Sequence, residues 1–499
     1  MRRGGLDRAR RAARRRFAHR IDRPVCAILA SPVLAGGTPD HREPGKQAET
    51  MPGEAHVLAQ PYSLGVDVIG HEPIDHRVGN LAMAWSGHYA YIASGMTFSP
   101  TGALQTVSHS ATSGTAVIDV ADPRVPKLVR YLQDKGSIDA TETLNAMTFR
   151  GRSLLAASNY GGVAELGGPK EGWLALHDVT DCAHPRLISE TKWPEPVHTL
   201  TISPSGRYVY GTKLNPFTGA GGIEIIDISN PSAPHFLGTF EATRPDGSSF
   251  AFAPHELVFS PDERRVYVGV TSSRGGDLLP DVTRDKPGAI DFAAVGVDAG
   301  GIYIFDNSDF ADRKPDPRLR LVGTALHAGW HSPVRAHFAG KPYLVSAGEL
   351  GACPGAWPRI SSIANEEKPV RVGEFRLTMN RAENCPEPSA IEKASGGLVA
   401  RPGFVASHFQ DVDDAENTRL GLFSFIYGGV RIVDLRNPAK PSEVAYFKPG
   451  DPCMSHVRYV AASGQIWFAC NASGFYVIAL KPELRRALGL PGVAARRRD

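Results

Sequence analysis

The sequence predicts an all-β fold, a seven-bladed β-propeller built from four-stranded antiparallel blades, and three observations support this prediction. One phrase recurs seven times: an apolar strand, an Asp, a turn that contains Pro, and a second apolar strand. Another pair of strands precedes each copy. Gly (52) and Pro (39) are frequent and evenly spread over the 499 residues, as in chains of many short strands joined by turns.

The recurring phrase supplies the outer half of each blade. In most copies an Asp ends the first strand, and the interpretation that we favour is structural, because a carboxylate here accepts the backbone N–H groups of an Asx-type turn. In one degenerate copy we assign Ala364 to the Asp position. The copies begin at Thr115, Leu174, Ile223, Ile302, Ile360, Val430 and Phe475, and the turn residues are Asp119, Asp178, Asp227, Asp306 and Asp434.

The seventh copy lacks a fourth strand before Lys481-Pro482. Near the amino end, the segment YSLGVDVIG from Tyr62 is similar to the outer strand HFLGTF from His235, and no blade of its own precedes it. We therefore expect this N-terminal strand to become the fourth strand of blade seven. Such closure leaves no open sheet edge.

The phrases IEIIDISNPSAP from Ile223 and VRIVDLRNPAKP from Val430 resemble the LVIVD repeat of secreted bacterial and archaeal propellers. The resemblance covers about residues 60–482 and implies the fold rather than an activity. The His-x-x-x-x-Ser-Pro hairpins from His198 and His255 are also distantly similar to those of the selenium-binding protein and methanethiol oxidase propellers, which are metal-dependent.

Four regions are expected along the chain: an Arg-rich targeting segment (1–37), a linker (38–59), the propeller (60–482) and a basic C-terminal tail (483–499). The first 23 residues contain ten Arg, and an apolar run from Pro24 to Leu34 precedes Ala35-Gly36-Gly37. This order is typical of a signal peptide, so we expect an extracytoplasmic protein, with a disordered basic tail as the alternative. No apolar stretch is long enough to span a bilayer. The net charge of +3 comes from this segment, so no nucleic-acid partner is expected.

Strand starts nearest the propeller axis carry the candidate site. Aligning them by their apolar alternation and following turns predicts a polar ring at one mouth of the channel. Imidazole suits Cu and Zn, so the five His are candidate metal ligands for copper or zinc, with the two Asn completing the ring. Alternatively, these groups hold channel waters or bond to backbone. The ring residues are Asn80, Asn145, His198, His255, His331, His408 and His456, and His327 competes with His331.

The long insertions are expected on the same face as this mouth, at 271–300, 348–358 and 378–403. Two Cys pairs are candidate disulfides, Cys353 with Cys385 and Cys453 with Cys470, whereas Cys182 is expected as a free thiol. The run from Asp411 to Asn417 is rich in oxygen ligands, and we interpret it as a solvated acidic hairpin rather than a calcium loop.

Three functions are compatible with these features, and whether the protein is an enzyme stays open. The first is a binding module that holds a protein, glycan or small-molecule ligand at the looped face. The second is an oxidase that depends on copper or another metal. The third is a hydrolase of the lactonase kind, which the nitrogen-rich ring disfavours because Ca²⁺ prefers oxygen ligands. No nucleophile elbow, HExxH, Walker loop or dinucleotide fingerprint is visible.

Overall fold

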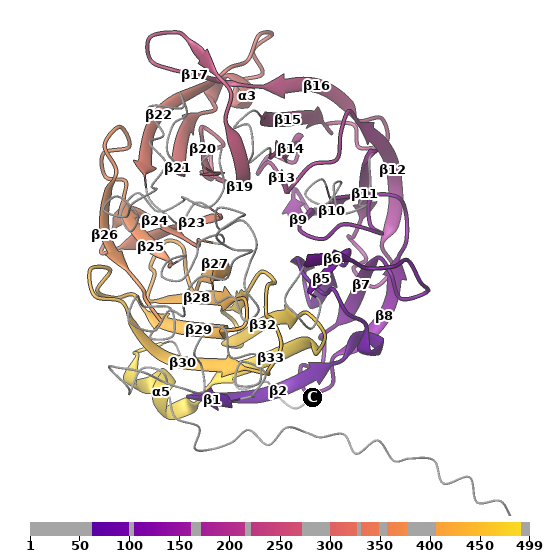
Figure 1. Ribbon diagram of the computed structural model, residues 1–499, viewed down its shortest axis with the longest axis vertical. Coiled ribbons are helices and arrows are strands. Elements are labelled where there is room, and N and C mark those ends of the chain that lie inside the picture. Colours follow the sequence, from indigo (N-terminus) through magenta and orange to yellow (C-terminus); the bar gives the residue numbers. More distant parts are fainter. Residues whose placement is uncertain are drawn as a thin grey trace, which may run out of the picture. The chain divides into compact units, whose positions relative to one another are not determined.

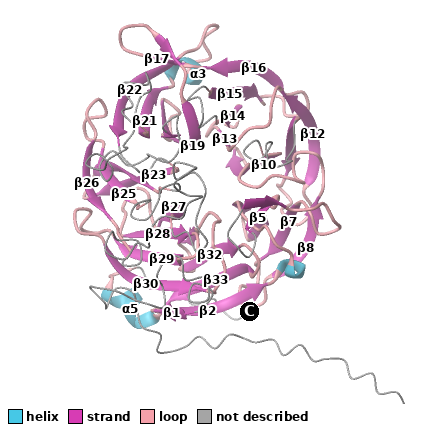
Figure 2. Ribbon diagram, in the orientation of Figure 1, coloured by secondary structure: helices cyan, strands magenta, loops and turns pink. Residues whose placement is uncertain are grey.

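The computed structural model describes residues 62–98, 104–160, 171–214, 221–271, 300–326, 331–348, 357–377 and 406–490. All of them belong to the unit Val33–Asp499. In this unit seven antiparallel sheets are arranged as a ring (Figure 1). Strands dominate and the helices are short (Figure 2). The predicted seven-bladed propeller with four-stranded blades is therefore confirmed.

Blades one to four contain the following strands, given from the axis outward. Blade one has β3 (Met83–Ser86), β4 (Tyr89–Ile92), β7 (Thr115–Asp119) and β8 (Lys127–Leu132). Blade two has β9 (Leu144–Phe149), β10 (Arg152–Ser158), β11 (Gly172–Asp178) and β12 (Arg186–Trp193). Blade three has β13 (Leu200–Ile202), β14 (Tyr208–Lys213), β15 (Gly222–Asp227) and β16 (His235–Phe240). Blade four has β19 (Ala253–Phe259), β20 (Arg265–Thr271), β21 (Gly301–Asp306) and β22 (Leu319–Leu326).

Blades five to seven complete the ring. Blade five has β23 (Pro333–Phe338), β24 (Lys341–Ser346), β25 (Arg359–Ser362) and β26 (Val370–Glu374). Blade six has β27 (Ser407–Val412), β28 (Leu420–Phe425), β29 (Gly429–Asp434) and β30 (Ser442–Lys448). Blade seven has β31 (Arg458–Val460), β32 (Gln465–Cys470), β33 (Gly474–Leu480) and β2 (Val66–Glu72).

The remaining elements are short additions to the blades. Strands β5 (Met96–Phe98) and β6 (Leu104–Thr106) pair with each other, and β17 (Ala242–Thr243) and β18 (Ser249–Phe250) extend blade four. The helices are the 3₁₀ turn η3 (Ile74–His76), α3 (Ser308–Ala311) and α5 (Pro482–Ala487). After α5, Leu488 and Leu490 pack into the core between blades six and seven, so the propeller extends past the expected start of the basic tail.

The N-terminal strand closes the ring. Strand β2 pairs antiparallel with β33, from Val66 opposite Leu480 to Glu72 opposite Phe475. The residues just before it form β1 (Tyr62–Leu64), which pairs instead with β30 and gives blade six a fifth strand. One short segment therefore joins the last two blades through backbone hydrogen bonds.

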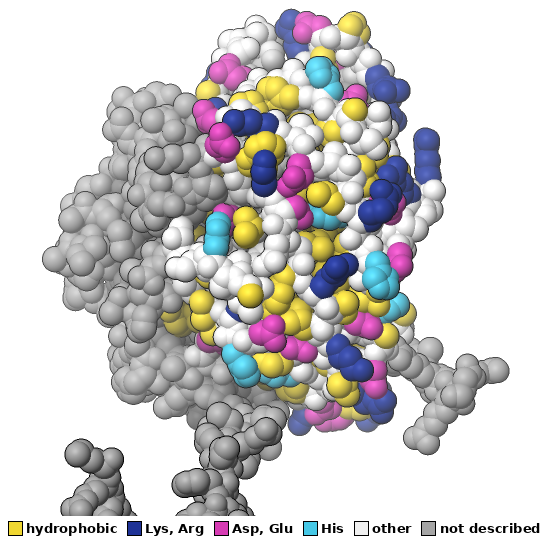
Figure 3. Space-filling model, turned by 90° about the vertical axis from the view of Figure 1, so that its right-hand side faces the viewer, with side chains coloured by type: hydrophobic (Ala, Val, Ile, Leu, Met, Phe, Trp, Pro, Cys, Tyr) yellow, Lys and Arg dark blue, Asp and Glu magenta, His cyan; other side chains and the backbone are white. Residues whose placement is uncertain are grey.

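Hydrophobic packing between neighbouring blades builds the core. Every pair of adjacent blades shares a cluster of buried apolar side chains, so the inner strands are covered on both faces. This explains why a third strand such as β15 is buried from Gly222 to Ile226 without alternation, because alternation is required only where one face meets water. The outer strand β16 alternates between exposed and partly buried side chains. On the side of the ring that carries β8 and β12, acidic and basic side chains are interspersed with apolar ones (Figure 3).

The Asp residues of the repeat have the structural role expected of them. The carboxylate of Asp227 accepts the N–H of Ser229 at 2.7 Å, and the Asp residues of the other copies make the equivalent bond. The assignment of Ala364 to this position was wrong by two residues. Ser362 ends β25, and its hydroxyl accepts the N–H of Ala364 at 3.5 Å.

Several outer strands contain a glycine, and a close approach between neighbouring blades explains why a glycine is needed there. A β-bulge interrupts the pairing of the two outermost strands in every blade, beside this glycine where it is present. A Cβ at Gly70, Gly323 or Gly373 would overlap a backbone carbonyl in the Pro-containing turn of the next blade. Gly238 is the exception, since its neighbour carries α3 in place of that turn and the nearest atom lies at 3.8 Å.

We predict that Gly323→Ala lowers the melting temperature, because the new methyl group would overlap the carbonyl oxygen of Glu366 and push blades four and five apart. Overpacking of this kind costs about 1–3 kcal/mol. Circular dichroism during heating measures the effect. Thr324→Ala on the same strand is the control and should change the melting temperature less. Equal melting temperatures for Gly323→Ala and the wild type would contradict the close-packing explanation.

Candidate metal centre

Five ionisable side chains meet at the propeller axis, where the inner strands begin. They come from blades two to six and are Glu142, His198, His255, His331 and His408, which we call the channel cluster. Their exposure ranges from 0% for His331 to 6% for His198. Burying ionisable groups is unfavourable unless they are paired or bind an ion, so this cluster requires a physical explanation.

Equivalent backbone positions bring three of these side chains to the axis. In blade two the carbonyl of Thr143 accepts an N–H from the next strand, and in blade three the carbonyl of Thr199 does the same. Glu142 and His198 stand one residue earlier, so the two side chains occupy the same position in their blades. His331 occupies it in blade five by the same criterion.

β-bulges position the other two. The pairing of β19 with β20 shifts register between Pro254 and Leu257, and the pairing of β27 with β28 shifts between Ser407 and Gln410. Each irregular stretch contains one His of the channel cluster, His255 or His408. A bulge re-aims the side chains of its strand, which is a frequent feature of functional sites.

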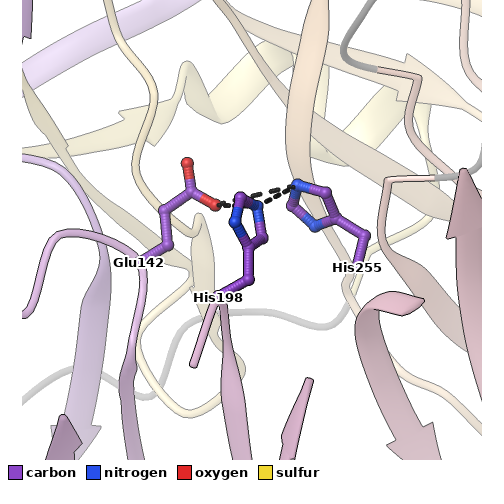
Figure 4. Close-up of side chains that lie close together, drawn as sticks. All are labelled: Glu142, His198 and His255. Carbon is purple, nitrogen blue, oxygen red and sulfur yellow. Dashed lines mark hydrogen bonds and ion pairs between the residues drawn. The ribbon is translucent and has the colours of Figure 1, made fainter. Parts of the chain in front are cut away.

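The distances within the first half of the channel cluster match those of a metal site (Figure 4). The Nε2 atoms of His198 and His255 are 2.8 Å apart, and they lie 3.6 Å and 3.9 Å from Oε2 of Glu142. A point equidistant from these three atoms is about 2.0 Å from each, which is the usual length of a bond from a transition-metal ion to imidazole or carboxylate. We call this group the Oε2 triad.

The second half of the channel cluster faces the other oxygen of the same carboxylate. Nε2 of His408 lies 3.3 Å from Oε1 of Glu142, and His331 completes a second group whose ligand atoms are all within 4.8 Å of one another. Nδ1 of His408 donates a hydrogen bond of 2.7 Å to the carbonyl of Met454. Since Nδ1 is used by this hydrogen bond, Nε2 is the nitrogen that could bind a metal ion, an arrangement common in metal sites. We call this group the Oε1 triad.

Apolar and aromatic side chains surround the channel cluster. The hydroxyl of Tyr160 lies 3.4 Å from Nε2 of His198, and the ring of Phe409 packs edge-on against His331 and His408. The rings of Tyr160 and Phe409 pack in one hydrophobic cluster with Leu81, Met96, Ile426 and Met454. Such surroundings strengthen electrostatic interactions and exclude water. The buried Glu and His groups could therefore hold a metal ion, most readily one that accepts nitrogen ligands.

Three residues of the predicted ring lie outside the channel cluster. In blade one, Leu81 occupies the position that His198 has in blade three. Asn80 lies one residue before it, and the Asn80 amide bonds to Arg77 and Asn471. Asn145 lies three residues past the equivalent position, and its oxygen accepts the N–H of Ile202 at 3.1 Å. His456 lies one residue past the equivalent position of blade seven and pairs with Glu256. The structure therefore brings together the predicted ring residues of blades three to six and places those of blades one, two and seven apart from them.

The sequence alignment missed Glu142 because the inner hairpins of the blades differ in length. Strand β9 spans Leu144–Phe149, whereas β13 spans only Leu200–Ile202, so counting back from the following turn gives Asn145. A local signal was present. Glu142-Thr143-Leu144 has the same spacing as His198-Thr199-Leu200.

Next to the channel cluster lies a cavity of about 290 Å³, lined by residues from all seven blades. His456 and Glu256 face it, with Nε2 of the imidazole 3.1 Å from Oε1 of the carboxylate. Nδ1 of His456 accepts the N–H of Met83, so Nε2 carries the proton and donates to Glu256. Phe409 stacks on His456 at 3.8 Å between ring centroids, and it therefore contacts both the channel cluster and this pair.

The cysteines divide into three groups. Cys453 and Cys470 form a disulfide that joins the start of blade seven to the end of β32. Cys182 is a free thiol, half-buried and 3.5 Å from the hydroxyl of Ser86. Cys353 and Cys385 lie outside the described residues, as do His327, the Arg-rich segment, the linker and most of the three long insertions.

Comparison with known proteins identifies the repeat. The family model for the LVIVD repeat matches residues 201–242, which cover blade three. The chain carries an LVIVD repeat. No curated protein sequence matches it at a significant level. The similarity to selenium-binding protein and methanethiol oxidase is not shown by these comparisons.

Solved structures of the same architecture are remote in sequence. The periplasmic gluconolactonase PpgL of Pseudomonas aeruginosa is 11% identical with a TM-score of 0.49, over 74% of this chain and 88% of that protein. Sqt1 of Chaetomium thermophilum, solved with the N-terminus of ribosomal protein L10, is 12% identical with a TM-score of 0.47, over 83% of this chain and 99% of that one. These similarities concern the fold alone. Among the described residues, no helix has the length and apolar character to cross a membrane.

The acidic run after His408 is less solvated than expected. Asp411 is half-buried and lines the cavity, and its carboxylate accepts the N–H groups of Val412 and Tyr459. Burial raises the pKa of this carboxyl to about 7. The carboxylate of Asp413 accepts the N–H groups of Arg419 and Leu420, so backbone groups of the hairpin use these oxygens.

We predict that Asp411 makes the stability of the protein fall between about pH 4 and pH 7. An unfolded Asp ionises near pH 4, whereas this folded carboxyl ionises at about 7, so the folded state retains its proton over that interval and becomes relatively less stable as the pH rises. Asp411→Asn should remove this loss of stability, because the amide does not ionise. Its melting temperature relative to the wild type should therefore be higher at pH 8 than at pH 5. The exposed Asp414→Asn is the control, and a difference for Asp411→Asn that is constant with pH would contradict the prediction.

Proposed function

We propose that this propeller is a metalloprotein that binds a divalent transition-metal ion at the Oε2 triad of Glu142, His198 and His255. The equidistant point about 2.0 Å from all three ligand atoms is the observation that carries the proposal. Two imidazoles and one carboxylate suit zinc, copper or iron, which include the metals that the sequence favoured.

Electrostatics supports the same proposal. The 2.8 Å contact between the Nε2 atoms of His198 and His255 requires a proton or another cation between two lone-pair donors. Among the described residues, no hydrogen bond to Oε2 of Glu142 is present, and the carboxylate is only 2% exposed. A bound cation would stabilise all three groups and offset the cost of their burial.

The chain positions its ligands and restricts access to them. The bond from His408 to the carbonyl of Met454 orients one imidazole, and Tyr160 lies beside His198 where it can donate to a group bound there. A metal ion here would act as a Lewis acid or as a redox centre. The oxidase interpretation requires such an ion, whereas a calcium-dependent hydrolase would be expected to offer more oxygen ligands. The binding-module alternative depends on insertions that lie outside the described residues.

We predict that the full-length purified protein contains a transition metal and that His198→Ala with His255→Ala removes it. Inductively coupled plasma mass spectrometry measures the metal, and differential scanning fluorimetry measures its effect on stability. After treatment with a chelator, adding Zn²⁺ or Cu²⁺ should raise the melting temperature, because a ligand at 100 times its Kd stabilises the folded state by about 2.7 kcal/mol. The double variant should show no such rise.

The matched control is His88→Ala with His235→Ala, which removes two exposed imidazoles. This variant should retain the metal content and the thermal shift of the wild type. A wild-type protein that is free of metal as purified, and whose melting temperature does not change with Zn²⁺, Cu²⁺ or Fe²⁺, would overturn the proposal and favour the binding module.

A further inference from the structure

The channel cluster contains more ligands than one ion needs. The Oε2 triad alone supplies three donors at bonding distance from a single point. His331 and His408 remain, both at most 1% exposed, and both contribute to a second set of three ligand atoms. The two sets share one residue, Glu142, whose Oε2 faces His198 and His255 and whose Oε1 faces His408.

We propose that the channel cluster holds two metal ions bridged by the Glu142 carboxylate. This inference rests on the proposed function, since it adds a second ion to the same centre. One ion is bound by Oε2, His198 and His255. The other is bound by Oε1, His331 and His408.

Contacts between the two triads place the ions next to each other. The rings of His255 and His331 belong to different triads, and their centroids are 3.8 Å apart. Oε2 lies near His198 and His255, and Oε1 lies 3.3 Å from His408, so the carboxylate turns one oxygen toward each pair of imidazoles. Bridged metal ions in proteins are typically about 3.5–4 Å apart, a separation that these contacts permit.

The orientation of His408 supports a ligand role in the second triad. Its Nδ1 donates to the carbonyl of Met454 at 2.7 Å, which turns Nε2 toward Oε1 of Glu142. Nε2 of the imidazole then faces a carboxylate oxygen at 3.3 Å, a contact that requires a proton or a metal ion between the two atoms. A second metal ion meets this requirement.

Charge balance identifies a further ligand class for the pair. Two divalent ions bring four positive charges, and Glu142 supplies the single negative charge among the five ligands. A buried excess of this size is unfavourable. We therefore expect a small anion, with hydroxide as the simplest case, to bind between the two ions as in other two-metal sites.

Metal stoichiometry tests the inference in the full-length chain. Protein stripped with a chelator is dialysed against Cu²⁺, and copper per chain is measured by mass spectrometry. We expect two ions in the wild type and in the His88→Ala, His235→Ala control. We expect one in the His331→Ala, His408→Ala variant, which retains the Oε2 triad. Circular dichroism establishes that each variant is folded.

Electron paramagnetic resonance provides a readout that does not depend on variants. Two Cu²⁺ ions bridged by one carboxylate couple magnetically and lose signal relative to the copper present, whereas the variant with one ion should give full intensity per copper. Glu142→Gln, which has nearly the same shape, offers only one ligating oxygen. It should lose at least one ion together with the coupling.

The outcomes separate this inference from the proposed function. One uncoupled copper per wild-type chain, retained when His331 and His408 are replaced, overturns the second ion and leaves the metal site. One copper that is lost when those two residues are replaced also overturns it. Absence of copper from the wild type overturns the pair of ions, and the proposed function falls with it when Zn²⁺ and Fe²⁺ also leave the melting temperature unchanged.

Discussion

Antiparallel pairing between β2 and β33 is the constraint on which the rest of this structure depends. It joins residues more than four hundred positions apart and fixes blade seven against blade one. With the ring closed, the number of blades determines how tightly the inner strands surround the axis. The channel cluster follows from that closure, because no two of its members come from the same blade.

Blade packing and the site are connected by the same repeat. The Asp turn of one blade lies under the outer-strand glycine of the preceding blade, which keeps neighbouring sheets close. Apolar side chains of the middle strands then fill the space between neighbouring sheets. At the axis, Glu142 and four imidazoles face one another at low exposure.

The sequence predicted the blades far better than the ring of axial residues. Blade number, strand count and the closing strand follow from a phrase with strong hydrophobic patterning and a turn chemistry that repeats. The axial positions depend instead on the lengths of the inner hairpins. Strand β9 is twice as long as β13, a difference that hydrophobic patterning does not reveal. Asn145 was consequently aligned at the position that Glu142 occupies, and His456 was assigned to the ring although it faces the neighbouring cavity.

The long span of the channel cluster has a consequence for how the protein matures. Its ligands begin at residue 142 and end at residue 408, with one contribution from each of five consecutive blades. A nascent or partly assembled chain has at most isolated imidazoles, which compete poorly for metal in a cell. Binding of the proposed metal would therefore require the finished ring, and the metal content of a preparation would then report the fraction of molecules that have completed folding.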